Sequence, residues 1–162
     1  RDDPAMSTAP WQDDPLVLER LVGAQAPVYA QARAELGAGD KQSHWMWFVF
    51  PQLAALGRSS TARYYGIGSR AEALAYWKHP LLGRRLAECT SLVVGLQGRT
   101  AHQVFHSPDD LKFRSCMTLF DAVAVAVAVA VAVAEGESIF RQALDKHSAG
   151  EPDAPTLSLL GR

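Results

Sequence analysis

Apolar residues recur at helical spacing near the start of the chain. Across residues 18–36 they fall three or four positions apart, which places them on one face of an α-helix. Asp14 and Pro15 supply a capping side chain and a proline suited to a first helical turn, and the glycine-rich stretch 37–39 ends the pattern. Pro27 lies within this run. Because its ring removes a backbone donor and crowds the preceding turn, we expect the helix to kink or split there.

The next segment, residues 41–52, has no clean period. Six consecutive positions are hydrophobic: Trp45, Met46, Trp47, Phe48, Val49 and Phe50. A run that is apolar on every side must be buried nearly all round. Periodicity does not choose between a buried strand and a buried helical turn, and Pro51 ends either one.

Capping sequences mark the starts of further helices. Ser69 with Glu72, and Thr100 with Gln103, have the spacing of a capping box. Pro80 is expected to end the helix that Ser69 begins and to start the next. The sequence 107–110 combines a cap, a proline and acidic residues at another helix start. Two later starts are predicted, one capped by Ser138 and a last turn over residues 156–160.

Residues 122–134 alternate strictly between alanine and valine. A period of two is typical of a strand, yet the tract has no polar face, no turn residues and no evident partner strand. We interpret it as a low-complexity insertion that continues the preceding helix or bridges to the next. The alternative is an exposed β-prone stretch that promotes aggregation, in which case deletion of residues 123–133 would raise soluble yield.

Length and composition favour one globular unit. A chain of 162 residues, 48% hydrophobic and 20% charged, supplies one core and is too short for two comfortable domains. We predict an all-α, compact multihelical single domain over residues 14–160, with a disordered N-terminal extension at 1–13. Met6 is the expected translation start. Cys89 and Cys116 lack metal-site spacing and are expected to be small core residues.

Net charge and the lengths of the apolar runs argue against two classes of partner, nucleic acids and membranes. A net charge of −1 gives no electrostatic excess for holding a nucleic-acid backbone, so nucleic acid is not an expected partner. No apolar run reaches the length of a membrane span, and the N-terminus does not resemble a signal peptide. A cytoplasmic location without membrane association is therefore expected.

Candidate chemistry is densest around His44. Lys41, Ser43, His44 and Trp45 place titratable groups against large aromatic faces just after a glycine-rich turn. An imidazole there could act as a general acid or base, and an indole such as that of Trp45 could stack on a ligand ring. The alternative is that the aromatic residues form core and His44 is a hydrogen-bonded structural group.

A second candidate group begins a predicted helix. Asp110 could serve as a carboxylate base facing His44, with Lys112 and Arg114 holding an anion near the helix N-terminus. Alternatively Asp110 and Arg114, four residues apart, form a surface pair worth a few tenths of a kcal/mol. A weaker group is His79 with the arginine pair that follows Pro80, which could bind phosphate. The remaining histidines are scattered, so neither a metal site nor a cofactor is predicted.

Three strings together resemble a known family: SHWMWFVFPQ at residues 43–52, HPLLGRRLAECT at 79–90 and SPDDLKFRSCMTLF at 107–120. They are similar to the bacterial domain-of-unknown-function family 1810, over about residues 16–160, with a departure at the alanine–valine tract. The resemblance implies an all-helical fold and no established activity. Some members are labelled calpastatin, but a compact, aromatic chain does not resemble that disordered and charged protease inhibitor. The family motif covers Ser43, His44, Trp45, Met46, Trp47, Pro51, Gln52, His79, Pro80, Leu82, Gly83, Asp110, Lys112, Arg114, Ser115, Met117 and Phe120.

Two hypotheses give the conspicuous residues a function, and a third does not. In the first, the protein binds or processes a small polar or nucleotide-like metabolite, with His44 and Asp110 as catalytic residues and Lys41, Trp45, His79, Lys112 and Arg114 as ligand-binding residues. In the second, it is a non-catalytic module that binds a peptide or protein through exposed Trp45 or Trp77. In the third, the aromatic motif is simply core. Whether the protein is an enzyme stays open.

Overall fold

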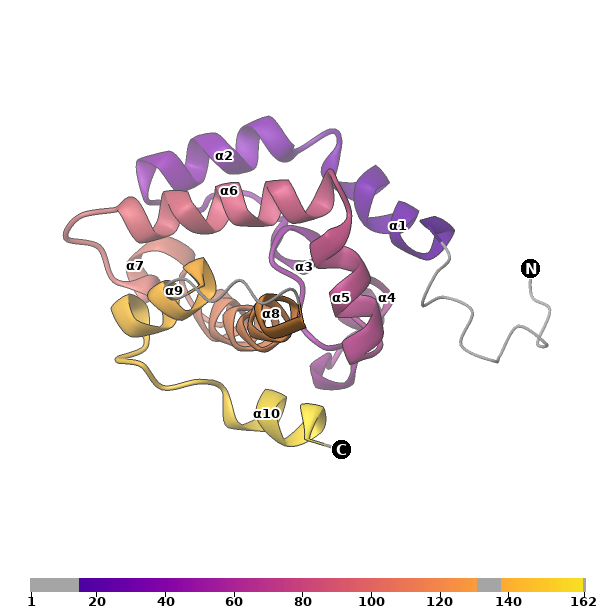
Figure 1. Cartoon of the computed structure of the whole chain (residues 1–162). Helices are drawn as coiled ribbons and strands as arrows, with labels where there is room; N and C mark the ends of the chain where they lie inside the picture. Colours follow the sequence, from indigo (N-terminus) through magenta and orange to yellow (C-terminus); the bar gives the residue numbers. More distant parts are fainter. Residues whose placement is uncertain (1–14, 131–137, 162) are drawn as a thin grey trace, which may run out of the picture.

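The computed structural model describes residues 15–130 and 138–161, which form helices packed around one core (Figure 1). The predicted extension at residues 1–13 lies outside the described residues. Helix α8 contacts α5, α7, α9 and α10, and α6 packs on α2, α5 and α9. Within the described residues, β-type pairing is limited to one isolated parallel bridge between Leu53 and Ile67. The helices are α1 (Pro15–Gln25), α2 (Tyr29–Ala38), α3 (Met46–Val49), α4 (Ser60–Tyr65), α5 (Arg70–Lys78), α6 (Leu82–Gly95), α7 (Ala101–Phe105), α8 (Asp109–Ala130), α9 (Ile139–His147) and α10 (Ala154–Leu160), with a 3₁₀ turn at Ala54–Leu56.

The split at Pro27 is confirmed. Helix α1 ends at Gln25 and α2 begins at Tyr29, so proline occupies the joint, where its missing N–H costs no helical hydrogen bond. Helix α2 ends at Gly39, whose φ of 72° lies in the left-handed region that favours glycine. Arg99 donates to the Gly39 carbonyl oxygen at 2.8 Å and fixes this end of the helix.

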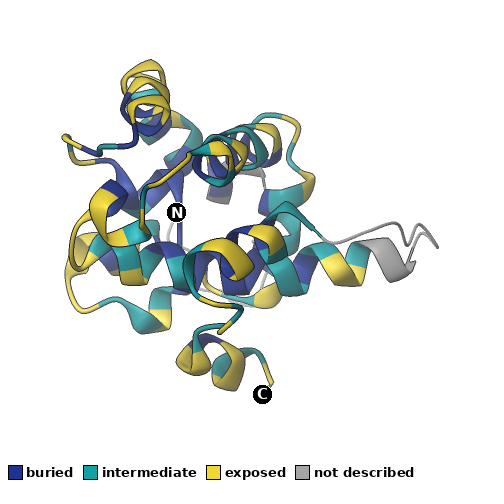
Figure 2. Ribbon diagram, turned by 90° about the vertical axis from the view of Figure 1, so that its left-hand side faces the viewer, coloured by how far each residue is buried: buried dark blue, intermediate teal, exposed yellow. Residues whose placement is uncertain are grey.

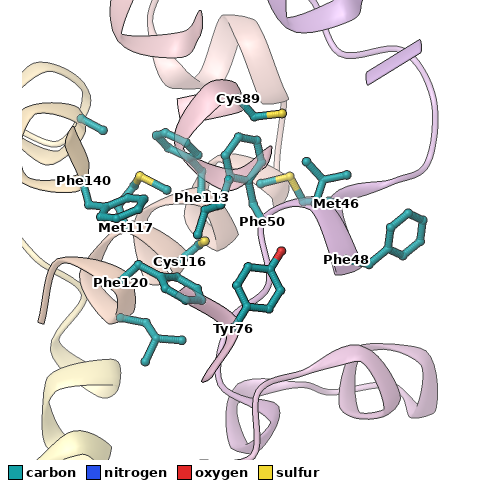
Figure 3. Close-up of a cluster of buried hydrophobic side chains, with 14 of the residues drawn as sticks. Met46, Phe48, Phe50, Tyr76, Cys89, Phe113, Cys116, Met117, Phe120 and Phe140 are labelled. Atoms are coloured by element: carbon teal, nitrogen blue, oxygen red, sulfur yellow. The ribbon is translucent and has the colours of Figure 1, made fainter. Parts of the chain in front are cut away.

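The aromatic run at 45–50 contains a buried helical turn, α3, and the alternative of a strand does not apply. Phe50 follows the turn and is 1% exposed. Its ring meets those of Phe105 and Phe113 edge to face, with centroids 5.7 and 5.1 Å apart. Figure 3 shows Phe50 and Phe113 together at the centre of the hydrophobic cluster. Cys89 and Cys116 are buried and free, as predicted.

The capping sequences start helices as expected, with one difference in detail. Thr100 and Gln103 form a complete capping box on α7. Ser69 accepts a hydrogen bond from Glu72 N at 3.1 Å, but the Glu72 carboxylate accepts from Gly68 N at 2.6 Å. Ser138 caps α9, and Asp153 caps α10.

At the start of α8 the expected cap is replaced by backbone hydrogen bonds. The amide of Asp110 donates to the carbonyl of His106, and the amide of Leu111 donates to that of Pro108. The helix therefore begins at Asp109, directly after Pro108, and its first N–H groups find partners in the preceding turn. This turn brings α7 and the first turn of α8 together.

The alanine–valine tract continues the preceding helix up to Ala130, as the first interpretation expected; the rest of it lies outside the described residues. Val123 is buried at 2% exposure, whereas Val125 is 51% exposed. Before the tract, Asp121 accepts a hydrogen bond from the Ser138 hydroxyl at 2.7 Å. The two flanks of residues 122–137 are thus joined directly.

Burial follows the packing of the helices. Figure 2 shows the buried residues gathered on the faces that the helices turn toward one another, while α10 near the C-terminus is largely exposed. In the stretch from 15 to 130 and from 138 to 161, no helix combines the length and the hydrophobicity that a membrane crossing requires.

Candidate functional site

A pocket of about 400 Å³ lies between the segment that leads into α3 and the turn that joins α7 to α8. Its volume falls within the range of small-molecule sites. Both sides of the pocket come from segments that the sequence singled out. The lining residues are Lys41, Gln42, His44, Met46, Trp47, Phe105, His106, Ser107, Pro108, Asp109 and Lys112.

Lys41 is the buried cation of this site. Its ammonium lies 2.9 Å from Asp109 Oδ2, donates to the Ser43 carbonyl at 2.7 Å, and stands 5.0 Å from the Trp45 ring centroid. The residue is 8% exposed, so the ion pair is shielded from water. The positive charge of Lys41 is therefore largely neutralised by Asp109, and the pair ties the loop before α3 to α8.

Glu35, near the end of α2, accepts hydrogen bonds from the same loop. The sequence did not single it out. Its carboxylate accepts hydrogen bonds from Trp45 Nε1 at 2.9 Å, from Gln31, from the backbone of Gln42, and from both the amide and the hydroxyl of Ser43. Burial alone would raise the pKa of this carboxyl, but the donated hydrogen bonds outweigh it and lower the pKa to about 2. Glu35 is thus ionised and buried, and its carboxylate accepts the hydrogen bonds that hold the loop before α3.

The structure corrects the role expected for Trp45. This side chain is 0% exposed and its Nε1 is bonded to Glu35, so its ring cannot stack on a ligand or anchor a partner protein. Trp47, two residues on, is half-buried and lines the pocket. Trp77 is also half-buried, and its ring packs against Phe140 with centroids 5.0 Å apart. Neither tryptophan named for a peptide-binding module is an exposed anchor.

Three polar side chains of the pocket, those of Lys112, His44 and Ser107, form no hydrogen bond within the residues that the structure describes. Lys112 stands 5.7 Å from the Trp47 ring centroid and 3.8 Å from Asp109 Oδ1, which is an ion pair too long for a hydrogen bond. Its side chain is only 27% exposed. These groups can therefore form hydrogen bonds to a ligand.

Asp110 lies beside the pocket, and its carboxylate is engaged elsewhere. Its Oδ2 is 3.3 Å from His102 Nδ1, and its Oδ1 accepts from the amide of Leu111. The carboxylate that lines the pocket is that of Asp109. The structure therefore brings His44 and Lys41 together with Asp109, whereas the expected pairing of His44 with Asp110 is not formed.

His106 forms part of the pocket wall and was not a predicted site residue. Its Nε2 lies 3.0 Å from Asp40 Oδ1, which connects the end of α7 to the end of α2. The residue has a φ of 65°, a backbone conformation that side chains other than glycine seldom adopt. Such conformations persist where the surrounding structure holds them, and they cluster at functional sites.

Two predicted ligand-binding residues have structural partners instead. His79 Nδ1 accepts hydrogen bonds from the amides of Leu81 and Leu82, each at 3.1 Å, so the imidazole caps the start of α6. Arg114 donates to the carbonyls of Glu151 and Pro152 at 2.7 and 3.0 Å and fastens the segment before α10 to α8. Neither residue lines the pocket.

A second hollow, of about 460 Å³, adjoins the first. The two share Pro108 and Lys112. Its lining residues are Gln52, Leu56, Arg58, Ser59, Ala62, Pro108, Leu111, Lys112, Ser115, Asp153 and Pro155. Lys112 thus stands at the junction of the two.

The described residues hold no group of three or more His, Cys, Asp or Glu side chains placed to bind a metal ion. Among the described residues the site offers the Lys112 ammonium and the His44 imidazole, neither of them hydrogen-bonded, and the indole face of Trp47. These groups can bind an anion, exchange a proton and contact a flat ring.

Comparison with known proteins gives two matches, one to a family model and one to a solved structure. A family model described as "Protein of unknown function (DUF1810)" matches residues 15–160. The crystal structure of the conserved hypothetical protein Rv1873 from Mycobacterium tuberculosis is similar, with 48% sequence identity and a TM-score of 0.83. That match covers 92% of this chain and 99% of the mycobacterial one. No curated protein matches the chain.

Proposed function

Since the chain belongs to the DUF1810 family of proteins of unknown function, its activity has to be inferred from the site, and we propose that it binds a small metabolite with a phosphate or carboxylate group. The ligand occupies the pocket between the segment before α3 and the start of α8. Lys112 holds the anionic group, His44 forms a further hydrogen bond, and Trp47 contacts the ring or apolar part.

The observation that carries this proposal is the difference between the polar groups of the pocket. Lys41 is paired with Asp109, and His106 with Asp40. Lys112, by contrast, is 27% exposed, approaches Asp109 only to 3.8 Å, and has no hydrogen-bond acceptor among the residues 15–130 and 138–161. A single carboxylate thus serves two ammonium groups, and it forms a hydrogen bond with Lys41 alone. A partly buried ammonium loses hydration without regaining hydrogen bonds, so an anion placed beside it recovers them.

A proton-transfer role is a second candidate for His44. Its imidazole is exposed at the pocket and forms no hydrogen bond among the described residues, so both ring nitrogens can reach a ligand. The partner proposed for it from the sequence, Asp110, faces His102 in this structure. A catalytic role for the pair would require Asp110 to leave His102.

The proposal places the protein in the cytoplasm and gives nucleic acid no part. A formal net charge of −1 supports the latter, since a nucleic-acid surface needs clustered positive charge. Small phosphorylated and carboxylated metabolites fit a pocket of about 400 Å³ in which Lys112 has no hydrogen-bond acceptor among the described residues.

Isothermal titration with nucleoside monophosphates, ribose 5-phosphate and inorganic phosphate tests the proposal. We expect at least one of these to bind, and Lys112→Met to weaken binding by roughly 1.5–3 kcal/mol, the usual contribution of a hydrogen bond to a charged group. Methionine keeps the length of the side chain and its contact with Trp47 while removing the charge. Lys78→Met is the matched control, because Lys78 is exposed on α5 and does not line the pocket.

The control variant should bind as the unaltered protein does. Equal affinity of the Lys112→Met variant and the unaltered protein for every bound phosphate would contradict the proposed anion site. Loss of binding in both lysine variants would show a non-specific charge effect, which also contradicts it.

A further inference from the structure

The second hollow points to the rest of the ligand. Building on the proposed function, we propose that the ligand has two parts: an anionic head at Lys112 and an apolar aryl or alkyl body that lies in the second hollow, over the first turns of α8. The ligand class is then a phosphate or carboxylate that carries an aryl or alkyl group, and a simple sugar phosphate does not belong to it.

The two hollows are adjacent. Pro108 and Lys112 line both. A narrow hollow lies between them and is lined by residues of each, among them Trp47 from the first and Ala62 from the second, again with Lys112. The Lys112 ammonium can therefore contact a ligand in either hollow.

The walls of the second hollow are chiefly carbon. Leu56, Ala62, Leu111 and Pro155 line it together with Pro108. Such a surface recognises apolar groups by burying their area and offers few hydrogen bonds.

Three of the polar side chains that line this hollow are bonded within the fold. Asp153 accepts from the amide and the hydroxyl of Thr156 at 3.1 and 2.7 Å. Ser115 donates to the Leu111 carbonyl at 3.2 Å, and Ser59 accepts from the amide of Ala62 at 3.1 Å. The side chains of Gln52, Arg58 and Lys112 form no hydrogen bond among the described residues. Apart from these three, the hollow offers a ligand body chiefly apolar contacts.

Leu111 supports the same conclusion. It is 59% exposed, among the most exposed large hydrophobic side chains of the described residues, and it stands beside the hollow one position before Lys112. A single exposed leucine needs no explanation. Leu111, however, lines this hollow next to Lys112, so it presents apolar area where a ligand body would cover it.

The experiment compares ligands that differ only in the apolar body. Isothermal titration of the full chain is carried out with methyl phosphate and phenyl phosphate, and in parallel with acetate and phenylacetate, which distinguishes a phosphate head from a carboxylate head. We expect the phenyl member of one pair to bind about tenfold more tightly than its methyl counterpart, or more, because the ring leaves water.

Variants then locate the body. Leu111→Ser should abolish most of the advantage of the phenyl ligand and leave the affinity for the methyl ligand unchanged. Leu157→Ser is the matched control: Leu157 is 45% exposed, on α10, and does not line the hollow. Urea denaturation of both variants checks that each remains folded.

The outcomes separate the two proposals. Equal binding of the methyl and phenyl ligands, both weakened by Lys112→Met, would overturn the two-part ligand and leave the anion site standing. Equal loss in the Leu111→Ser and Leu157→Ser variants would also overturn it. If none of the four ligands binds, the anion site is wrong and the two-part ligand is wrong with it.

Discussion

Replacing Glu35 with glutamine is expected to lower the free energy of unfolding by about 3 kcal/mol at pH 7. The pKa of this carboxyl falls from about 4.5 to about 2 on folding, and each pKa unit corresponds to about 1.4 kcal/mol. Glutamine keeps the shape but loses the charge, and its amide N–H₂ would face donors such as Trp45 Nε1 and the Ser43 hydroxyl. Urea denaturation followed by circular dichroism measures the change.

The pH dependence of stability provides an independent check on the ionised state of Glu35. Because the folded pKa is depressed, the stabilisation is complete above the unfolded pKa near 4.5 and is lost as the pH falls toward 2. The unaltered protein should therefore lose stability across this interval. The Glu35→Gln variant should lose about 3 kcal/mol less over the same range.

Glu19→Gln is the matched control, because Glu19 is exposed on the neighbouring helix α1. It should change the free energy of unfolding by no more than about 0.5 kcal/mol. A Glu35→Gln variant as stable as this control at pH 7 would show that the buried carboxylate does not hold the loop before α3.

Truncation of Trp45 to alanine is expected to cost about 4 kcal/mol of unfolding free energy, within the range of roughly 3–5 kcal/mol for large aromatic residues. The side chain is 0% exposed, so its removal leaves a cavity in the core beside Glu35 of α2 and deprives Glu35 of one donor. The loss would be a large part of the total stability of a domain of this size. Chemical denaturation monitored by circular dichroism provides the measurement.

A further variant separates the ring from its N–H group. Trp45→Phe keeps most of the buried area and should cost roughly 1.5–3 kcal/mol, the usual contribution of a hydrogen bond to a charged group, because Glu35 loses one donor and keeps the others. Trp47→Ala, two residues away and half-buried, should cost less stability than Trp45→Ala and should weaken ligand binding more than it weakens the fold. Equal stability losses at the two tryptophans would contradict the division between core and pocket.

Most of the helical architecture could be predicted from short-range signals. Pro27 removes a backbone N–H donor, and the side chains of Ser69, Thr100 and Ser138 accept hydrogen bonds from amides three residues on, so each effect depends on sequence neighbours alone. The segment 45–50 could not be assigned, because a run that is apolar on all sides has no period to distinguish a turn of helix from a strand.

The site was predicted only at the level of segments. Asp109 and Asp110 are adjacent on a helix and point about 100° apart, so which of the two meets Lys41 depends on how α8 is rotated. The same holds for Trp45 and Trp47. Glu35 carried a signal that was missed: it lies three residues after Ala32 and before Leu36, on the buried face of α2.

The hydrogen bond between Asp121 and Ser138 also bears on how this chain tolerates change in length. The bond holds Ser138, at the start of α9, against Asp121 of α8, and it sets no number of residues for the chain between Ala130 and Ser138. Lengthening a closed loop costs only about 0.6 kcal/mol for each doubling. Between Ala130 and Ser138, a peptide tag or a fluorescent reporter could therefore be inserted to follow the protein in cells, without altering the surfaces on which a ligand would bind.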